Sequence, residues 1–463
     1  AFISDVSERR GYNSTGELIN HTPIAEIALD FWRQYSYSGD KVYLREKALP
    51  FILEAAKFFT CLFAKGDDGL YHATQGSGLE GWIKLKDGLT ELAYGRALFS
   101  VALQALQESG AKAPQAAVWK EMLDQFAPLP VISAGDSIIT RQDPVFRRGY
   151  NKGRAAPGAE IFAAGWGIKE NRWLTTFYPG DENITHGFKL LDGIFPSVPS
   201  CPVFPSGWIG LTQKGQPLFK MAASTLLLYG PEVTGWDPVP IALARLGLAS
   251  ELAQDLERFP QRWQIYVNGW GHWGLEGEIN KDYEYFFRTN QVRDVSRGVK
   301  SEERFPLPMW PFRHMSMEAM SVLATAMNEA LLQSHDGVIR IMPAVTAQQS
   351  ARFTLHARGG FIVSAEKKQE SLAFVAIKSL LGKNCRVEIP WPAADLYVGG
   401  KKTARLTNDK IQQIKTKAGQ TLIMVPSGVR LSDWTVSAET PAANQKARRH
   451  SSGKAQLGLE RMF

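Results

Sequence analysis

Apolar positions recur with a helical period over the first two thirds of the chain. In "TPIAEIALDFWRQYSYSGDKVYLREKALPFILEAAKFFTCLFAK", which begins at Thr22, they lie three and four residues apart, as in amphipathic helices. The pair Gly39–Asp40 between the two apolar runs predicts the end of one helix and the cap of the next. Further helices are predicted at 87–108, 114–126, 216–229, 238–247, 249–258 and 315–334.

Long segments rich in aromatic residues, glycine and proline separate these helices. The three longest cover residues 65–86, 128–186 and 262–313. Loops of this length are uncommon in compact domains unless they carry function. Helical hairpins joined by such loops predict a closed double ring of helices, with the loops forming a cleft at one end. We therefore expect a mainly-α catalytic domain over residues 1–337.

The pattern changes after residue 337. The segments "GVIRIMPAV", "ARFTLHARGGFIVSAEKK" and "SLAFVAIKSL" are short, alternate between apolar and polar residues, and are separated by turn residues. They predict an all-β module over residues 338–434. The remaining residues, 435–463, are polar and basic, without aromatic residues interleaved for base stacking. We expect a disordered tail there rather than a nucleic-acid-binding arm.

Composition adds three constraints. The chain has 463 residues, of which 44% are hydrophobic, enough to bury one or two large cores. No apolar run approaches the ~18 residues that a membrane span requires. Cys61, Cys201 and Cys385 are far apart and form no CxxC, so neither a disulfide framework nor a zinc site is indicated.

The first residues indicate neither a compartment nor a natural start. They lack the basic, apolar and small-residue order of a signal peptide, and they contain no initiator methionine. We expect the chain to begin inside a larger protein or to be a processed fragment. The oligomeric state does not follow from the sequence.

The motifs of several large enzyme classes are absent. The chain contains no Walker A motif, no GxGxxG opening a helix, no HExxH and no GxSxG. Its eight histidines form no ligand pair at helical spacing, so we expect neither a metal nor an organic cofactor. The loops instead place carboxylates among tryptophans and glycines. Tryptophan suits the apolar faces of sugar rings, and glycosidic cleavage uses one protonated and one ionised carboxyl group.

Three loop segments carry the candidate chemistry. "GSGLEGW" places Glu80 beside Trp82, just before the helix predicted from residue 87. "NGWGHWGLEGEINKDYEYF" contributes Asn268, Trp270, His272, Trp273, Glu276 and Glu278. "PLPMWPFRHMSMEA" contributes Trp310, Arg313, His314 and Glu318. A carboxyl group held near tryptophan in a dry loop has a raised pKa, which suits a general acid.

Each of these residues also has an ordinary interpretation. Glu80 can be a solvated loop carboxylate, Glu276 can belong to a surface turn, and the two histidines can be structural. Glu318, in the first turn of a predicted helix, interacts favourably with the helix dipole whatever else it does.

Two stretches resemble a known enzyme family. "NEALLQSHDGVIRIMPAV" and "FTLHARGGFIVSAEKK" resemble the end of the catalytic domain and the C-terminal β-module of glycoside hydrolase family 95, the α-L-fucosidases and α-L-galactosidases. "FWRQYSYSGDKVYLREKALPFILEAAKFF" and "TGWDPVPIALARLGLASELAQDL" resemble two of its helical segments. The resemblance covers about residues 22–425. It implies an (α/α)6 barrel, a saccharide substrate and a secreted or periplasmic enzyme.

The resemblance also implies roles for two carboxylates. Family members are inverting, with a glutamate as general acid and an aspartate that activates water. "SGLE", ending at Glu80, occupies the position of the acid. For the base, an alignment on Pro311–Phe312 places Met315 at the aspartate position, whereas an alignment on "LLQSH" places Glu318 there. The family's asparagine pair has no clear equivalent.

The sequence as a whole predicts an inverting glycoside hydrolase. Glu80 would donate the proton, and Glu318 or Glu276 would activate water, on an α-L-fucoside-like or α-L-galactoside-like substrate. Two alternatives stay open. One is a carbohydrate-binding homologue with impaired catalysis, and the other is a polysaccharide lyase on a related helical toroid.

Overall fold

The computed structural model describes residues 21–74, 76, 85–133, 159–168, 171–175, 200–227, 238–262, 271–272, 315–316, 318–409 and 411–431. The expected basic tail, 435–463, lies outside these ranges. Within them, no helix combines the length and the apolar character needed to cross a membrane.

The first predicted helical pair is confirmed. Helix α2 (Thr22–Ser38) ends at Gly39, whose backbone has φ of 67° and whose N–H donates to the carbonyl of Tyr35. This left-handed conformation favours glycine. The Asp40 side chain accepts hydrogen bonds from the amides of Val42 and Tyr43 and so caps α3 (Lys41–Tyr43). The π-helical turn η1 (Leu44–Ala48) leads into α4 (Leu49–Thr60).

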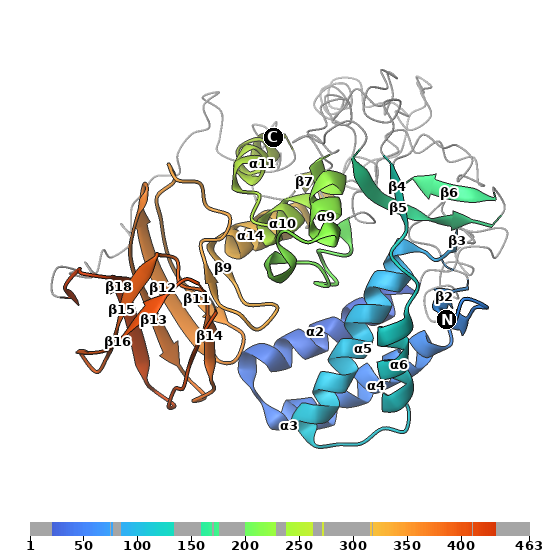
Figure 1. Ribbon diagram of the computed structural model, residues 1–463, viewed down its shortest axis with the longest axis horizontal. Helices are drawn as coiled ribbons and strands as arrows, with labels where there is room; N and C mark the ends of the chain where they lie inside the picture. Colours follow the sequence, from blue (N-terminus) through green and yellow to red (C-terminus); the bar gives the residue numbers. More distant parts are fainter. Residues whose placement is uncertain are drawn as a thin grey trace, which may run out of the picture.

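The other predicted helices also form, with small shifts at their ends. They are α5 (Leu89–Ser109), α6 (Ala116–Gln125), α9 (Pro217–Leu227), α10 (Val239–Arg245), α11 (Ala249–Arg262) and α14 (Glu318–Leu331). Helix α5 is central, because eleven consecutive residues from Leu89 to Phe99 are buried. It contacts α2, α4 and α6, while α10 contacts α14 and α11 (Figure 1).

A small sheet stands among these helices and corrects the interpretation of 128–186 as loop. Strand β5 (Glu160–Gly167) pairs with β3 (Leu85–Lys86), β4 (Val131–Ser133) and β6 (Arg172–Thr175). The sequence "EIFAAGWG" shows no alternation because nearly all of β5 is buried. A strand covered on both faces lacks the period of two that identifies a half-exposed strand. The first part of the chain is therefore not purely helical, and closure of its helices into a ring stays a prediction.

The predicted all-β module is confirmed as a six-stranded antiparallel sheet. Its strand order is β11-β12-β13-β18-β15-β16, and β14 pairs separately with β17. The strands are β11 (Ala351–Ala357), β12 (Phe361–Lys368), β13 (Ser371–Ser379), β14 (Cys385–Val387), β15 (Ala393–Val398), β16 (Lys401–Thr407), β17 (Gln412–Ile414) and β18 (Thr421–Pro426). Val363, Ile377 and Met424 are fully buried in a core separate from that of the helices. The exact domain boundaries stay predictions.

The two parts meet at the end of α14. Strand β9 (Leu332–Gln333) follows the helix directly and pairs with β10 (Arg340–Ile341). The buried Arg340 binds Asp336 at 2.8 Å and Glu388 at 3.0 Å, and it donates to the Thr212 hydroxyl at 3.0 Å. One guanidinium thus joins the segment before α9, the α14–β10 connection and the residues after β14.

Candidate active site

Two of the three loop segments singled out in the sequence lie side by side. Strand β7 (Gly271–His272) belongs to the segment from Asn268 to Glu278, and strand β8 (Met315–Ser316) belongs to the segment from Pro306 to Ala319. They pair antiparallel, with His272 opposite Met315. Helix α14 therefore begins two residues after a strand that pairs with Gly271 and His272.

Glu318 is the first residue of α14, two positions after β8. This placement agrees with its ordinary role as an acid at the positive end of a helix dipole. It also puts its backbone next to the β7–β8 pair. Both interpretations of Glu318 remain compatible with the backbone.

The ends of the third segment, which contains Glu80, meet just before α5. Gly76 and Leu85 exchange two backbone hydrogen bonds of 2.9 Å, so residues 77–84 leave and return at one point. Glu80 and Trp82 belong to this stretch and lie outside the described residues. The same holds for most of the other candidates: Asn268, Trp270, Trp273, Glu276, Trp310, Arg313 and His314.

A buried carboxylate lies beside the Gly76–Leu85 bridge. It was not among the candidates chosen from the sequence. Glu91, in the first turn of α5, is fully buried and accepts from the Thr90 hydroxyl at 2.9 Å. A Cβ atom on Gly76 or on Gly88 would collide with its carboxylate. The two glycines therefore make room for an acid at the base of the Glu80 segment. The only sequence signal was an acid in a first helical turn, three residues after Gly88, which many ordinary helices share.

A polar cluster extends from Glu91 along the next turn of α5. The buried Tyr94 hydroxyl donates to the Glu26 carboxylate, and burial raises the pKa of Glu26. Burial, followed by the charges of Glu26 and Glu91, raises the pKa of the Cys201 thiol well above its usual value. Cys201 is therefore a protonated interior thiol rather than a nucleophile.

A histidine–carboxylate pair anchors the start of α5. His72, on strand β2 (Tyr71–Ala73), binds Asp87 through Nδ1 at 2.8 Å and Asp68 through Nε2 at 3.1 Å. Asp87 also accepts from the Ala73 amide at 3.0 Å and holds a positive φ of 53°. These contacts fix the residues that follow the Glu80 segment. Among the described residues, no group of three or more His, Cys, Asp or Glu is arranged to hold a metal ion.

A family match identifies the C-terminal part of the chain. Residues 333–424 match the family model described as glycoside hydrolase family 95, C-terminal domain. We call these residues, 333–424, the family-95 domain after the family model that they match. The match covers the six-stranded sheet from β11 to β18, with only its last two residues left out. It confirms the resemblance over these residues and supports a carbohydrate-active enzyme.

Solved structures resemble a larger part of the chain. A protein described as "Putative kojibiose phosphorylase from human microbiome" shares 10% identity, with a TM-score of 0.40, over 86% of this chain and 50% of its own. The α-L-rhamnosidase of Streptomyces avermitilis, solved with L-rhamnose, shares 11% identity, with a TM-score of 0.33, over 85% of this chain and 32% of its own. The chain thus spans half the length of the first and about a third of the second. The comparison with curated proteins finds no match.

The family-95 domain begins where α14 ends. Helix α14 closes at Leu331 and the match starts at Gln333, inside the "LLQSH" segment. The candidate base, Glu318, therefore stands one 14-residue helix before the family-95 domain, or about 20 Å at 1.5 Å per residue. Glu318 and the family-95 domain lie at opposite ends of α14.

Proposed function

We propose that the chain is an inverting glycoside hydrolase. Its substrate cleft would be formed by the loops around Glu80, around the β7 segment and before α14. The pairing of His272 with Met315 is the main support, because it joins two segments chosen from the sequence for their carboxylates and tryptophans. The family-95 domain that follows α14 gives independent support for action on a saccharide.

The proposed chemistry divides two roles between two carboxyl groups. Glu80 protonates the leaving oxygen, and Glu318 or Glu276 activates a water on the opposite face of the sugar. Inverting enzymes keep these groups about 6.5–9.5 Å apart so that the water fits between them. Tryptophans from the same loops cover the sugar ring. We place these loops on an (α/α)6 barrel, of which the packed helices around α5 and around α14 form parts.

The substrate class is an α-L-fucoside or α-L-galactoside. The test is to incubate the protein with aryl α-L-fucoside, aryl α-L-galactoside and uronate-containing polysaccharides. Release of the phenol with formation of the inverted anomer, read by NMR, supports the proposal. Absorbance of an unsaturated product without water addition identifies a lyase instead, and saturable binding without turnover identifies a binding protein.

Substitution of the two carboxylates tests the roles. Glu80→Gln and Glu318→Gln should each lower kcat by about 10² to 10⁴, the usual contribution of general acid–base catalysis. Glu370→Gln, on the exposed β12–β13 turn, is the matched control and should leave kcat unchanged. Near-normal turnover of Glu318→Gln would transfer the role of base to Glu276, and Glu276→Gln would then be the variant that loses activity.

A further inference from the structure

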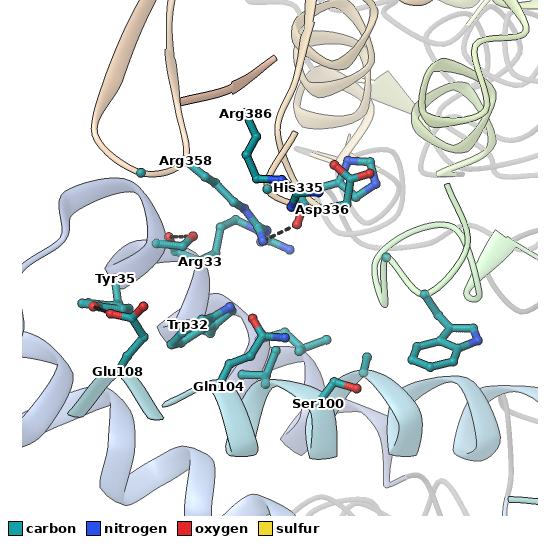
Figure 2. Close-up of a pocket in the computed structure, with 18 of the residues that line it drawn as sticks. Trp32, Arg33, Tyr35, Ser100, Gln104, Glu108, His335, Asp336, Arg358 and Arg386 are labelled. Atoms are coloured by element: carbon teal, nitrogen blue, oxygen red, sulfur yellow. Dashed lines mark hydrogen bonds between the residues drawn. The ribbon is translucent and has the colours of Figure 1, made fainter. Parts of the chain in front are cut away.

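A pocket of about 560 Å³ lies between the helices and the family-95 domain. Figure 2 shows its two walls. Trp32 of α2 and Ser100 and Gln104 of α5 form one wall, and Arg358 and Arg386 of the family-95 domain face them from the other. The volume falls within the range of about 300–1,000 Å³ that small-molecule sites occupy.

Ion pairs neutralise only part of this lining. Four charged lining residues have an opposite charge within ion-pair distance in the described part of the chain: Arg33 with Asp30, Glu108 with Lys41, Arg245 with Glu329, and Asp336 with Arg340. Three lining cations have no such carboxylate among the described residues: Arg358, Lys383 and Arg386. The lining residues therefore carry more positive than negative charge, although Lys383 and Arg358 also interact at longer range with Glu108 and Glu329.

Buried hydrogen-bonding atoms at the same place lack partners. Arg358 donates through Nη1 to the His335 carbonyl at 2.6 Å, but its Nε has no acceptor. Neither ring nitrogen of the buried His335 has a hydrogen-bond partner, although its Nδ1 lies 3.9 Å from Glu329 Oε2, and the Nε of Arg245 has no acceptor either. Burial lowers the pKa of Arg358 to about 10, which leaves it charged at neutral pH. These atoms have almost no accessible surface, so they mark an incompletely paired polar cluster beside the pocket and are not themselves ligand contacts.

The opposite wall suits the neutral part of a ligand. Ser100 and Gln104 make no hydrogen bond with other described residues, so their polar groups are available. Trp32 stands beside them and packs against Tyr35, with ring centroids 5.2 Å apart. A hydroxyl, an amide and an aromatic ring on one side, with guanidinium groups on the other, match a sugar that carries an acidic group.

The pocket is far from the described residues that flank the candidate catalytic loops. Helix α5 begins at Leu89, just after the Gly76–Leu85 bridge that closes the Glu80 segment. Gln104 lies 15 residues further along this helix, about 22 Å at 1.5 Å per residue. His335 likewise follows the end of α14, whereas Glu318 begins it. The pocket is therefore separate from the proposed active site.

We propose that this pocket binds an acidic saccharide unit, either a uronate or a sulfated sugar. Its anionic group lies between Arg358 and Arg386, and its ring lies against Trp32 with hydroxyls toward Ser100 and Gln104. The site holds a charged part of a polysaccharide at one end of the helices while the loops act at the other. It does not depend on which carboxylate performs the cleavage.

Isothermal titration of the full chain tests this site. The probes are glucuronate, galactose 6-sulfate, neutral galactose and inorganic sulfate. The acidic sugars should bind at least tenfold more tightly than galactose, because only they reach the unpaired cations. They should also bind more tightly than sulfate, because only they reach the α2–α5 wall. The stronger of the two acidic sugars identifies the source of the anionic group.

Variants on the exposed side of the pocket keep the fold intact. Arg386→Ala and Lys383→Ala should each weaken binding of the preferred acidic sugar about tenfold. Lys401→Ala, on the edge strand β16 outside the pocket, is the matched control and should not change it. Glu80→Gln should lower kcat by about 10² to 10⁴ and leave this binding unchanged, which separates the two sites. The proposal is wrong if galactose binds as tightly as the acidic sugars, or if Arg386→Ala binds the preferred acidic sugar as tightly as the unchanged protein. It is also wrong if no acidic sugar binds.

Discussion

His72 shows how one residue couples the loop before α5 to the helix itself. Its ring binds Asp87 on one side and Asp68 on the other, and Asp87 in turn accepts from the Ala73 amide. Partial burial disfavours the imidazolium, but the hydrogen bond and charge of Asp87, followed by those of Asp68, outweigh it and raise the pKa of His72. The charged form of His72 therefore stabilises the end of the Glu80 segment.

The raised pKa predicts a loss of stability at high pH. Because the folded protein holds this proton more tightly than the unfolded chain, the contribution is complete below the unfolded pKa of about 6.5. It is lost as pH rises through the folded pKa of His72. The free energy of unfolding in urea should therefore exceed that of His72→Asn at pH 5.5, and the difference should shrink by pH 9.

His356→Asn is the control, because its effect on stability should depend on pH in the opposite direction. Burial lowers the pKa of His356, so its contribution is present at high pH and falls as pH decreases. If His72→Asn showed the same pH dependence as His356→Asn, the pairing of His72 with Asp87 would not govern its titration.

His335 predicts instability toward acid. Burial, followed by the positive charge of Arg245, lowers the pKa of His335 to about 3. The unfolded chain takes up the proton near pH 6.5 and the folded protein does not, so stability is lost as pH falls from about 6.5 toward 3. The unfolding free energy of His335→Leu should fall less between pH 7 and pH 4.5 than that of the unchanged protein. An equal fall in both proteins would assign the acid sensitivity to other groups.

At the scale of elements, one hairpin turn of the family-95 domain contacts the helices. The turn between β11 and β12 contains Gly359 and Gly360, with φ of 88° and 74°. The Gly359 amide donates to the carbonyl of Ser36 in α2 at 2.7 Å. The turn between β15 and β16 has a similar backbone, with φ of 57° and 77° at Gly399 and Gly400, and its glycines have no neighbours where a Cβ would stand.

This pair of turns allows a matched measurement. Gly360→Ala and Gly400→Ala both force alanine into the left-handed region, which costs about 1–2 kcal/mol. A Cβ on Gly360 would also lie 2.6 Å from Leu381, and such overpacking adds about 1–3 kcal/mol. Thermal unfolding should therefore show the larger loss for Gly360→Ala. Equal losses would mean that Leu381 moves aside freely.

For the whole molecule, the junction around Arg340 links the helical part to the family-95 domain. Arg340 is 4% exposed and binds Asp336, Glu388 and Thr212, which come from three separate segments. Removal of one partner from a buried ion pair leaves the other charge uncompensated, which is unfavourable by about 3–5 kcal/mol.

Arg340→Met should therefore lower the free energy of unfolding by several kcal/mol, measured in urea. Lys368→Ala, which removes an exposed pair with Glu366, is the control and should change it by less than about 1 kcal/mol. A small effect of Arg340→Met would show that the apolar contacts of the junction suffice without the ion network.

The sequence by itself determined the helices, the β-module and the family of its C-terminal domain. These predictions rest on local patterns: the periodicity of apolar residues, the Gly39–Asp40 signal and the alternation of apolar and polar residues after residue 337. Local patterns specify the conformation of the nearby backbone. Strand β5 was not predicted, because a strand buried on both faces lacks the alternation of apolar and polar residues.

Only the tertiary structure decided which distant segments meet. The pairing of His272 with Met315, the buried Glu91 between Gly76 and Gly88, and the cation-lined pocket each join residues far apart in the chain. Such contacts depend on how the helices and the sheet pack, and no local pattern records them. The sequence could thus name carboxylates and arginines, but their neighbours, and with them their charge state and chemistry, came from the fold.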